Sequence, residues 1–144
     1  IMVRRFSRHF VISALIILVV DQVTKFLVDF LRPQFKASFL QLHYITNTGA
    51  GFGILKGNSF LLGVISLLVG LLILWKYEDF PKRKEIQTVL GIFLGGVFGN
   101  MIDRFLRRYV IDFIDVGFWP AFNIADAAIS ISVVLLLIYS WREK

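Results

Sequence analysis

The sequence predicts an all-α membrane protein with four transmembrane helices. Of its 144 residues, 57% are hydrophobic, more than the roughly 45–50% that is usual in soluble domains. The mean hydropathy is +0.74, and the apolar residues gather in four long segments. Because a chain of this length forms one domain, we expect a single integral membrane domain over residues 1–144.

Each of the four segments is close to the ~20 residues that cross the hydrocarbon core of a bilayer. Residues 57–75 form a charge-free run of 19, and residues 86–102 add 17 more. The first segment is too long for a cleavable signal peptide, and no small-residue cleavage site follows it. We predict spans at about residues 10–31, 57–75, 86–104 and 122–141.

The basic residues predict the orientation of these spans, because cytoplasmic connections are enriched in Lys and Arg. One side of the membrane receives nine of the 16 basic residues: Arg4, Arg5, Arg8, Lys76, Lys82, Arg83, Lys84, Arg142 and Lys144. We therefore expect both chain ends to be cytoplasmic. The net charge of +6 then reflects the topology and an electrostatic attraction to anionic lipid. Nucleic-acid binding is disfavoured, since no basic stripe alternates with aromatic residues.

The missing residue types exclude several chemistries. The chain has no cysteine, which removes thiol nucleophiles, disulfides and thiolate metal sites. Its two histidines, His9 and His43, flank the first span, and no HExxH motif is present. No serine lies in a GxSxG elbow. Neither a metal nor a cofactor is therefore expected, and any hydrolytic chemistry falls to carboxylates.

The connection between the first two spans predicts a small extracytoplasmic β-like segment. Residues 39–45 are rich in β-branched and aromatic side chains, and three glycines follow within residues 49–53. Glycines at this density mark tight turns or close backbone approach. In the second extracytoplasmic connection, Phe118 and Trp119 suit the aromatic belt at the membrane interface.

Several polar groups near or inside the spans have structural interpretations. An ionisable group at bilayer depth costs a few kcal/mol and therefore needs a partner or a function. Asp21 and Lys25 are spaced i and i+4, so they share a helix face and can form an ion pair. The neighbouring Asp103 and Arg104 can pair at the end of the third span. Gly91, Gly95 and Gly99 in the third span form a small-xxx-small face, which allows close helix packing. The polar Asn100 follows them near the end of that span.

Two carboxylates allow a catalytic interpretation. Asn123 suits a helix N-cap, and Asp126 three residues later suits a capping-box variant. Asp112, however, lies isolated among Val110, Ile111 and Phe113. Burial and a neighbouring carboxylate both raise an aspartate pKa, so a close pair holds one proton between its members. Such a pair supplies one base and one acid for attack of water on an amide.

Five sequence blocks carry a resemblance to a known family. They are Asp21-Gln-Val-Thr-Lys25, Asn47-Thr-Gly-Ala50, Gly95-Gly-Val-Phe-Gly-Asn-Met-Ile-Asp-Arg104, Val110-Ile-Asp-Phe113 and Phe122-Asn-Ile-Ala-Asp126. In their order and spacing they resemble the lipoprotein signal peptidases (signal peptidase II), a family of bacterial inner-membrane aspartic peptidases. The resemblance covers nearly the whole chain.

The resemblance implies a role for each matching residue. Asp112 and Asp126 are the implied catalytic pair, and the supporting or substrate-binding positions are Asp21, Lys25, Asn47, Asn100, Asp103, Arg104 and Asn123. The implied substrate is a prolipoprotein carrying a diacylglyceryl-modified cysteine, cleaved just before that cysteine to release the signal peptide. The resemblance further implies membrane lipid as a partner, inhibition by the cyclic peptide globomycin, no obligate protein partner, and an active site near the extracytoplasmic face of the inner membrane.

The chain departs from the family pattern in two places. Arg108 stands where the family usually has a glycine, two residues before the Val-x-Asp-Phe block. The stretch from Asp112 to Asp126 is also shorter than is usual, which affects the flap over the site.

Two other functions are open at the level of the residues. Intramembrane Asp and Lys residues also occur in ion or proton relays, so a small membrane carrier or relay subunit is the alternative. The wholly apolar second span and the lack of an inverted repeat disfavour it. A non-catalytic assembly factor held together by the glycine face is the third reading.

Overall fold

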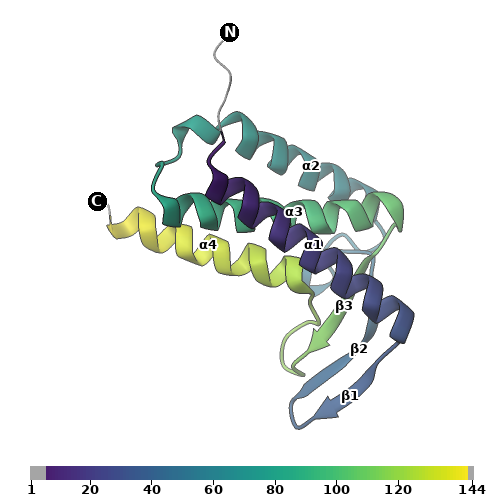
Figure 1. Cartoon of the computed structure of the whole chain (residues 1–144). Helices are drawn as coiled ribbons and strands as arrows, with labels where there is room; N and C mark the ends of the chain where they lie inside the picture. The colour runs from purple at the N-terminus through teal and green to yellow at the C-terminus, as the bar shows by residue number, and fades with distance from the viewer. Residues whose placement is uncertain (1–5, 143–144) are drawn as a thin grey trace.

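The computed structural model describes residues 6–142, so Arg4, Arg5 and Lys144 of the charge count lie outside the described residues. A bundle of helices carries a small sheet at one end (Figure 1). The helices are α1 (Arg8–Leu31), α2 (Ser59–Trp75), α3 (Lys84–Leu106) and α4 (Ile124–Arg142). The strands are β1 (Gln34–Ala37), β2 (Leu40–Asn47) and β3 (Val110–Asp115). In Figure 1, α1 begins and α4 ends at the bundle end remote from the sheet.

Three helices in residues 6–142 are long and apolar enough to span a membrane. They are α1, α3 and α4, with mean hydropathies of 2.1, 1.4 and 2.0. The apolar helix α2 is shorter, at 17 residues. The predicted second span loses its first two residues to a turn, because Gly57 adopts a left-handed φ of +85° and Asn58 becomes the N-cap of α2.

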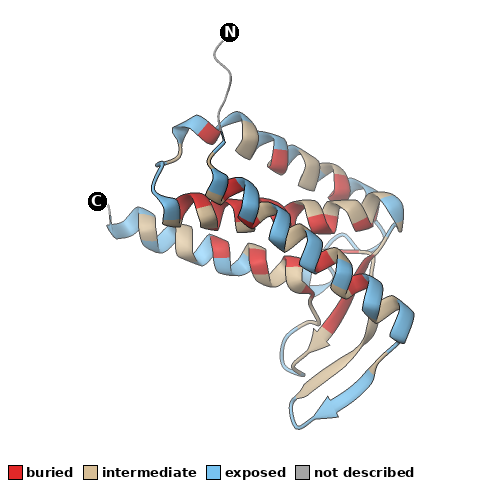
Figure 2. Ribbon diagram, viewed as in Figure 1, coloured by how far each residue is buried: buried red, intermediate tan, exposed pale blue. Residues whose placement is uncertain are grey.

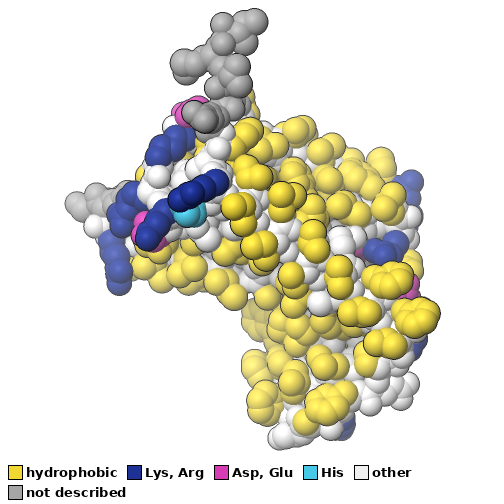
Figure 3. Space-filling model, viewed as in Figure 1, with side chains coloured by type: hydrophobic (Ala, Val, Ile, Leu, Met, Phe, Trp, Pro, Cys, Tyr) yellow, Lys and Arg dark blue, Asp and Glu magenta, His cyan; other side chains and the backbone are white. Residues whose placement is uncertain are grey.

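The bundle is organised around α3, which packs against α1, α2 and α4. In its most apolar window, 56% of α3 is buried, against 11% for α1 and 17% for α4. Figure 2 accordingly shows the buried residues concentrated on α3. The outward faces of the other helices are apolar yet exposed, and Figure 3 shows this hydrophobic surface running along the bundle. An apolar exterior is what a lipid environment favours.

A glycine face lets α1 approach α3 closely, as the small-xxx-small pattern predicts. A Cβ built at Gly95 would lie 2.5 Å from the Ala14 carbonyl oxygen, and one at Gly99 would lie 2.5 Å from Asp21 Oδ2. Gly91 meets α1 in the same way, at Phe10 and Ser13. The close approach at Gly99 places a carboxylate of α1 against the backbone of α3.

The bundle end remote from the sheet has an apolar core. Phe10, Tyr77, Leu90 and Leu94 form this buried cluster. The Tyr77 hydroxyl accepts a hydrogen bond from the Ser7 backbone N–H at 2.7 Å and donates to the Gln87 side chain at 2.5 Å. These bonds join the start of α1 to the connection between α2 and α3.

The sheet is antiparallel with strand order β1-β2-β3. The predicted β-like segment between the first two helices is present as β1 and β2. The third strand, β3, comes from the connection after α3 and pairs with β2, placing Asp112 opposite Ile45. A bulge between Leu42 and Ile45 shifts the register within this pair.

The turn from α3 into β3 does not need the glycine found in the family. Arg108 itself adopts the left-handed conformation there, with φ of 66°. This conformation costs a non-glycine residue roughly 1–2 kcal/mol. The Arg108 guanidinium lies 4.7 Å from the centroid of the Phe60 ring, a cation–π contact that offsets part of that cost. The departure from the family pattern therefore leaves the turn intact.

Substituting Gly99 tests the close packing of α1 on α3. We expect Gly99→Ala to lower the free energy of unfolding by about 1–3 kcal/mol, because the added methyl group overlaps the Asp21 carboxylate. Thermal unfolding in detergent measures the loss. Gly51→Ala is the matched control, since a Cβ at Gly51 meets no atom within 4 Å. Equal melting temperatures for the two variants would contradict the packing.

Candidate active site

Asp112 lies near the middle of β3 and is only 2% exposed. Two asparagine amides donate to its carboxylate. Asn47 Nδ2, at the end of β2, donates to Oδ2 at 3.0 Å. Asn123 Nδ2, just before α4, donates to Oδ1 at 2.9 Å. The pairing of β2 with β3 thus delivers both the carboxylate and one of its amide donors.

Asp126 lies in the first turn of α4 and forms a capping box with Asn123. The Asp126 backbone N–H donates to Asn123 Oδ1 at 2.9 Å, and the Asn123 backbone N–H donates to Asp126 Oδ2 at 3.2 Å. The capping interpretation of these two residues is therefore confirmed. The second oxygen of Asp126 accepts from Asn100 Nδ2 at 2.8 Å. The cap thus holds the carboxylate while leaving it half-buried beside α3.

Asn100 and Asn123 connect the two aspartates. Asn123 Nδ2 donates to Asn100 Oδ1 at 3.1 Å as well as to Asp112, and Asn100 in turn donates to Asp126. Asp112 and Asp126 both line one cavity of about 210 Å³, together with Asn47 and Arg104. The structure therefore brings the predicted pair to a shared cavity.

Burial and, after it, the negative charge of Asp126 raise the pKa of Asp112 from 3.8 to about 7. The hydrogen bonds from Asn47 and Asn123 favour the ionised form and oppose this rise. Near neutral pH, Asp112 is consequently poised between its protonated and ionised forms.

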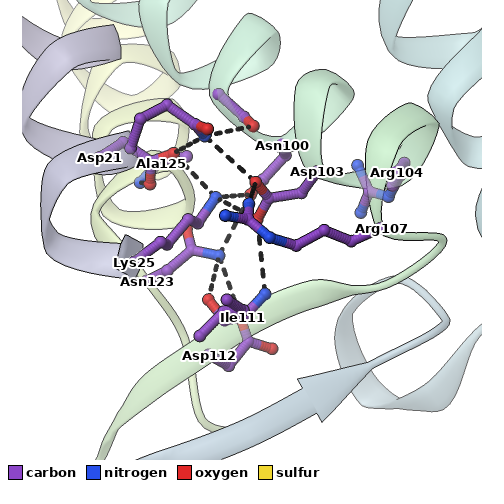
Figure 4. Close-up of polar contacts among 12 residues, drawn as sticks. Asp21, Lys25, Asn100, Asp103, Arg104, Arg107, Ile111, Asp112, Asn123 and Ala125 are labelled. Carbon is purple, nitrogen blue, oxygen red and sulfur yellow. Dashed lines mark hydrogen bonds and ion pairs between the residues drawn. The ribbon is translucent and has the colours of Figure 1, made fainter. Parts of the chain in front are cut away.

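A buried charge cluster of Asp21, Lys25 and Asp103 lies next to the candidate site (Figure 4). Lys25 Nζ lies 2.8 Å from Asp21 Oδ2 and 3.0 Å from Asp103 Oδ2, and all three side chains are 0% exposed. Lys25 also donates to Asn100 Oδ1 at 3.0 Å. The predicted pairing of Asp21 with Lys25 is confirmed, and it extends to α3 and to the amide that contacts Asp126.

The carboxylates of this cluster also hold the two elements that carry the candidate site. Asp21 Oδ1 accepts the Ala125 backbone N–H at 2.9 Å, which fixes the first turn of α4. Asp103 Oδ2 accepts the Ile111 backbone N–H at 3.4 Å, which fixes β3 beside Asp112. The ion pair is therefore more than a contact that orients the bundle.

The predicted pairing of Asp103 with Arg104 is wrong. Asp103 Oδ1 instead pairs with Arg107 Nη1 at 2.7 Å, because residues spaced i and i+4 share a helix face and adjacent residues do not. Arg104 points elsewhere, and its Nη1 donates to Ser66 Oγ at 3.3 Å. Its Nε is buried without a hydrogen-bond partner among the described residues. Arg104 lines the cavity, as described above.

Two residues that contact the cluster, Gln22 and Arg107, are not among those that the sequence motifs predict. Gln22 Nε2 lies 3.1 Å from both Asp103 Oδ1 and the Gly99 carbonyl oxygen. Gln22 was visible as a polar residue inside the first span, and Arg107 as the i+4 neighbour of Asp103. In residues 6–142, no group of three or more His, Asp or Glu side chains is placed to hold a metal ion.

Comparison with known proteins identifies the class of molecule. A family model described as signal peptidase (SPase) II matches residues 13–142. The fold resembles a bacterial membrane enzyme solved by the in meso method at 2.3 Å resolution, with a TM-score of 0.88 and 28% identity. That match covers 97% of this chain and 92% of the other.

Curated relatives agree with the family model. The lipoprotein signal peptidase of Shouchella clausii is 42% identical over 134 residues, covering 88% of this chain and 89% of the relative. That of Moorella thermoacetica is 37% identical over 136 residues, with the same two shares covered. The chain belongs to the signal peptidase II family and is thus a peptidase.

Removing the shared cation of the buried cluster should be costly. Lys25→Met leaves Asp21 and Asp103 without their common partner, so we expect a loss of about 3–5 kcal/mol of unfolding free energy. Melting temperature and yield of folded protein in detergent report it. Arg107→Met is the control, because Arg107 is 27% exposed and its removal leaves Lys25 on Asp103. A smaller loss for Lys25→Met than for Arg107→Met would contradict this assignment.

The raised pKa of Asp112 predicts a pH dependence of stability. Between about pH 4 and pH 7 the folded protein binds more protons than the unfolded chain, so the free energy of unfolding falls as the pH rises. Because the pKa rises from 3.8 to about 7 and each unit of pKa corresponds to about 1.4 kcal/mol, Asp112→Asn should at pH 8 be more stable than the original protein by up to about 4 kcal/mol. At pH 4 this advantage should vanish. Thermal unfolding in detergent at both pH values measures the effect.

Asp115 on the same strand is the control for that experiment. Its hydrogen bond from His43 lowers its pKa, so its contribution to stability is lost as the pH falls. Asp115→Asn should consequently give no gain in stability at pH 8. A loss of stability at pH 8 for Asp112→Asn, or a gain no larger than that of Asp115→Asn, would contradict the raised pKa of Asp112.

Proposed function

We propose that this protein is a membrane-embedded aspartic endopeptidase that removes the signal peptide from diacylglyceryl-modified prolipoproteins, cleaving before the lipid-bearing cysteine. The observation that best supports this proposal is that Asp112 and Asp126 line one cavity and that hydrogen bonds of Asn100 and Asn123 link their carboxylates. The lipoprotein substrate follows from the names of the relatives.

The proposed chemistry uses one proton shared between two carboxylates. The ionised aspartate removes a proton from a water molecule, whose oxygen attacks the carbonyl carbon of the scissile amide. The protonated aspartate then gives its proton to the leaving nitrogen as the C–N bond breaks. The pKa of about 7 at Asp112 supports such a division of roles near neutral pH.

Arg104 is proposed to act on the charge that develops during the attack. Its guanidinium lines the same cavity as the two aspartates, and its buried Nε–H has no acceptor among residues 6–142. A donor held unsatisfied in a water-poor cavity suits the oxygen of the tetrahedral intermediate. Ser66 on α2 holds the other end of the guanidinium.

The membrane placement is also part of the proposal. We place all four helices across the cytoplasmic membrane with both chain ends in the cytoplasm. At 17 residues, α2 is about 26 Å long, slightly short of the ~30 Å hydrocarbon core. The candidate site then lies at the extracytoplasmic end, next to the sheet.

The substrate is proposed to reach the site from the lipid. The cavity at the aspartates adjoins a second one of about 280 Å³, which Asp126, Trp119 and Ile131 line. Ile131 is 58% exposed on the outer surface of α4. Acyl chains can therefore lie along α4 while the peptide enters the polar cavity. Globomycin, the cyclic peptide inhibitor that the family resemblance implies, is proposed to occupy the same space.

The carrier alternative finds less support in the packing. The polar cluster occupies the sheet end of the bundle, whereas Phe10, Leu90 and Leu94 fill the other end with apolar side chains. A proton or ion relay needs polar groups along its whole path.

Substitution of the aspartates tests the proposal. Asp112→Asn and Asp126→Asn should each abolish cleavage of a synthetic diacylglyceryl-cysteine peptide in detergent, because an amide cannot exchange the proton. The double variant should be scarcely worse, since residues acting as one unit are not additive. Turnover by mass spectrometry, beside melting temperature, separates catalysis from folding.

Asp79→Asn makes the same chemical change on an exposed residue at the far end of the bundle and should keep full activity. The unsubstituted enzyme should show a pH–rate profile with two limbs that belong to the pair. Near-normal turnover of Asp126→Asn with reduced stability would reduce Asp126 to a helix cap and refute the dyad.

A further inference from the structure

The cavities around the aspartates form one trough with two different ends. Asp126 borders both the cavity along α4 and the cavity at the site. Asp112 borders the site cavity and a third cavity of about 340 Å³ on the sheet side. The site and sheet-side cavities also share Asn47, Ala50, Phe52, Pro120 and Ala121.

The two ends of the trough differ in chemistry. The α4 end has the apolar walls Trp119, Phe122 and Ile131. The sheet-side end is more polar than the α4 end, because Thr46, Thr48 and Lys56 line it beside apolar residues such as Ile45 and Phe52. Lys56 is exposed, and no ion pair involves it within residues 6–142. An unpaired ammonium therefore stands at the water-facing end, with the two aspartates between it and the lipid-facing end.

We propose that the sheet-side cavity receives the residue that follows the lipid-bearing cysteine, and that Lys56 favours an acidic side chain there over a basic one. This inference rests on the proposed function. The acyl chains of the cysteine require the apolar end of the trough, whereas the chain that continues beyond the cysteine must leave toward water. The cysteine lies at the dyad, so its next residue falls beside Lys56.

The loop that carries Lys56 is held in place rather than free. Thr48 Oγ1 accepts the Gly57 backbone N–H at 3.2 Å, and the Lys56 backbone N–H donates to the Gly53 carbonyl at 3.3 Å. Gly49 packs directly beneath Lys56, since a Cβ at Gly49 would lie 3.1 Å from its Cα. Lys56 thus acts as a positioning residue for the substrate and takes no part in the bond-breaking step.

The test compares three diacylglyceryl-cysteine peptides that differ only in the residue after the cysteine, which is Asp, Ser or Lys. For the unsubstituted enzyme in detergent, KM should be about threefold lower for Asp than for Lys, the size expected of an exposed ion pair. Lys56→Glu should reverse that order, and Lys56→Arg should restore it. The preference of the unsubstituted enzyme for Asp should shrink in 1 M salt, because salt screens an exposed ion pair.

Lys36→Glu is the matched control, because Lys36 carries the same charge in the same extracytoplasmic connection, on β1, but lines a separate cavity. It should keep the preference for Asp. An unchanged order in Lys56→Glu, or an equal reversal in Lys36→Glu, would overturn the assignment of Lys56 while leaving the peptidase function in place. If the unsubstituted enzyme cleaved none of the three peptides, the proposed function would be rejected and this inference with it.

Discussion

The ammonium group of Lys25 is the contact on which the rest of the structure depends. It is fully buried among Asp21, Asp103 and Asn100, where an uncompensated charge would cost several kcal/mol. Its partners come from two helices, so α1 and α3 must meet at one depth and in one rotation. Gly99 makes that meeting sterically feasible.

The candidate site is assembled from this cluster outward. Asp21 fixes the start of α4 through the Ala125 N–H, and Asp103 fixes β3 through the Ile111 N–H. Asn100 links Lys25 to Asp126, because its side chain accepts a hydrogen bond from Lys25 and donates one to Asp126. The charge network therefore stabilises the bundle and also sets the geometry of the two aspartates. Loss of one member should accordingly displace residues that it does not touch.

The helical segments were predictable because hydropathy is a local signal. The ion pair between Asp21 and Lys25 was predictable for the same reason, since it follows from their spacing within one helix. The meeting of Asp112 and Asp126 was only a hypothesis, since it depends on the pairing of β3 with β2. That pairing joins residues more than 60 positions apart, and although the β-branched and aromatic residues of 110–115 favour a strand, no local pattern identifies its partner. Arg104 does not pair with Asp103 as predicted, because adjacent residues of a helix point to different faces, whereas Arg107 at i+4 shares the face of Asp103.

The composition of the buried cluster bears on how the chain enters the membrane during synthesis. Asp21 and Lys25 form an ion pair within one helix, so α1 can partition into lipid as an electrically neutral segment before any later helix exists. Asp103, near the end of α3, likewise has an i+4 cation in Arg107, the residue that caps this helix. Each of these two buried carboxylates therefore has a counter-ion four residues away on its own segment. Only the contact between Lys25 and Asp103 requires the two helices to associate.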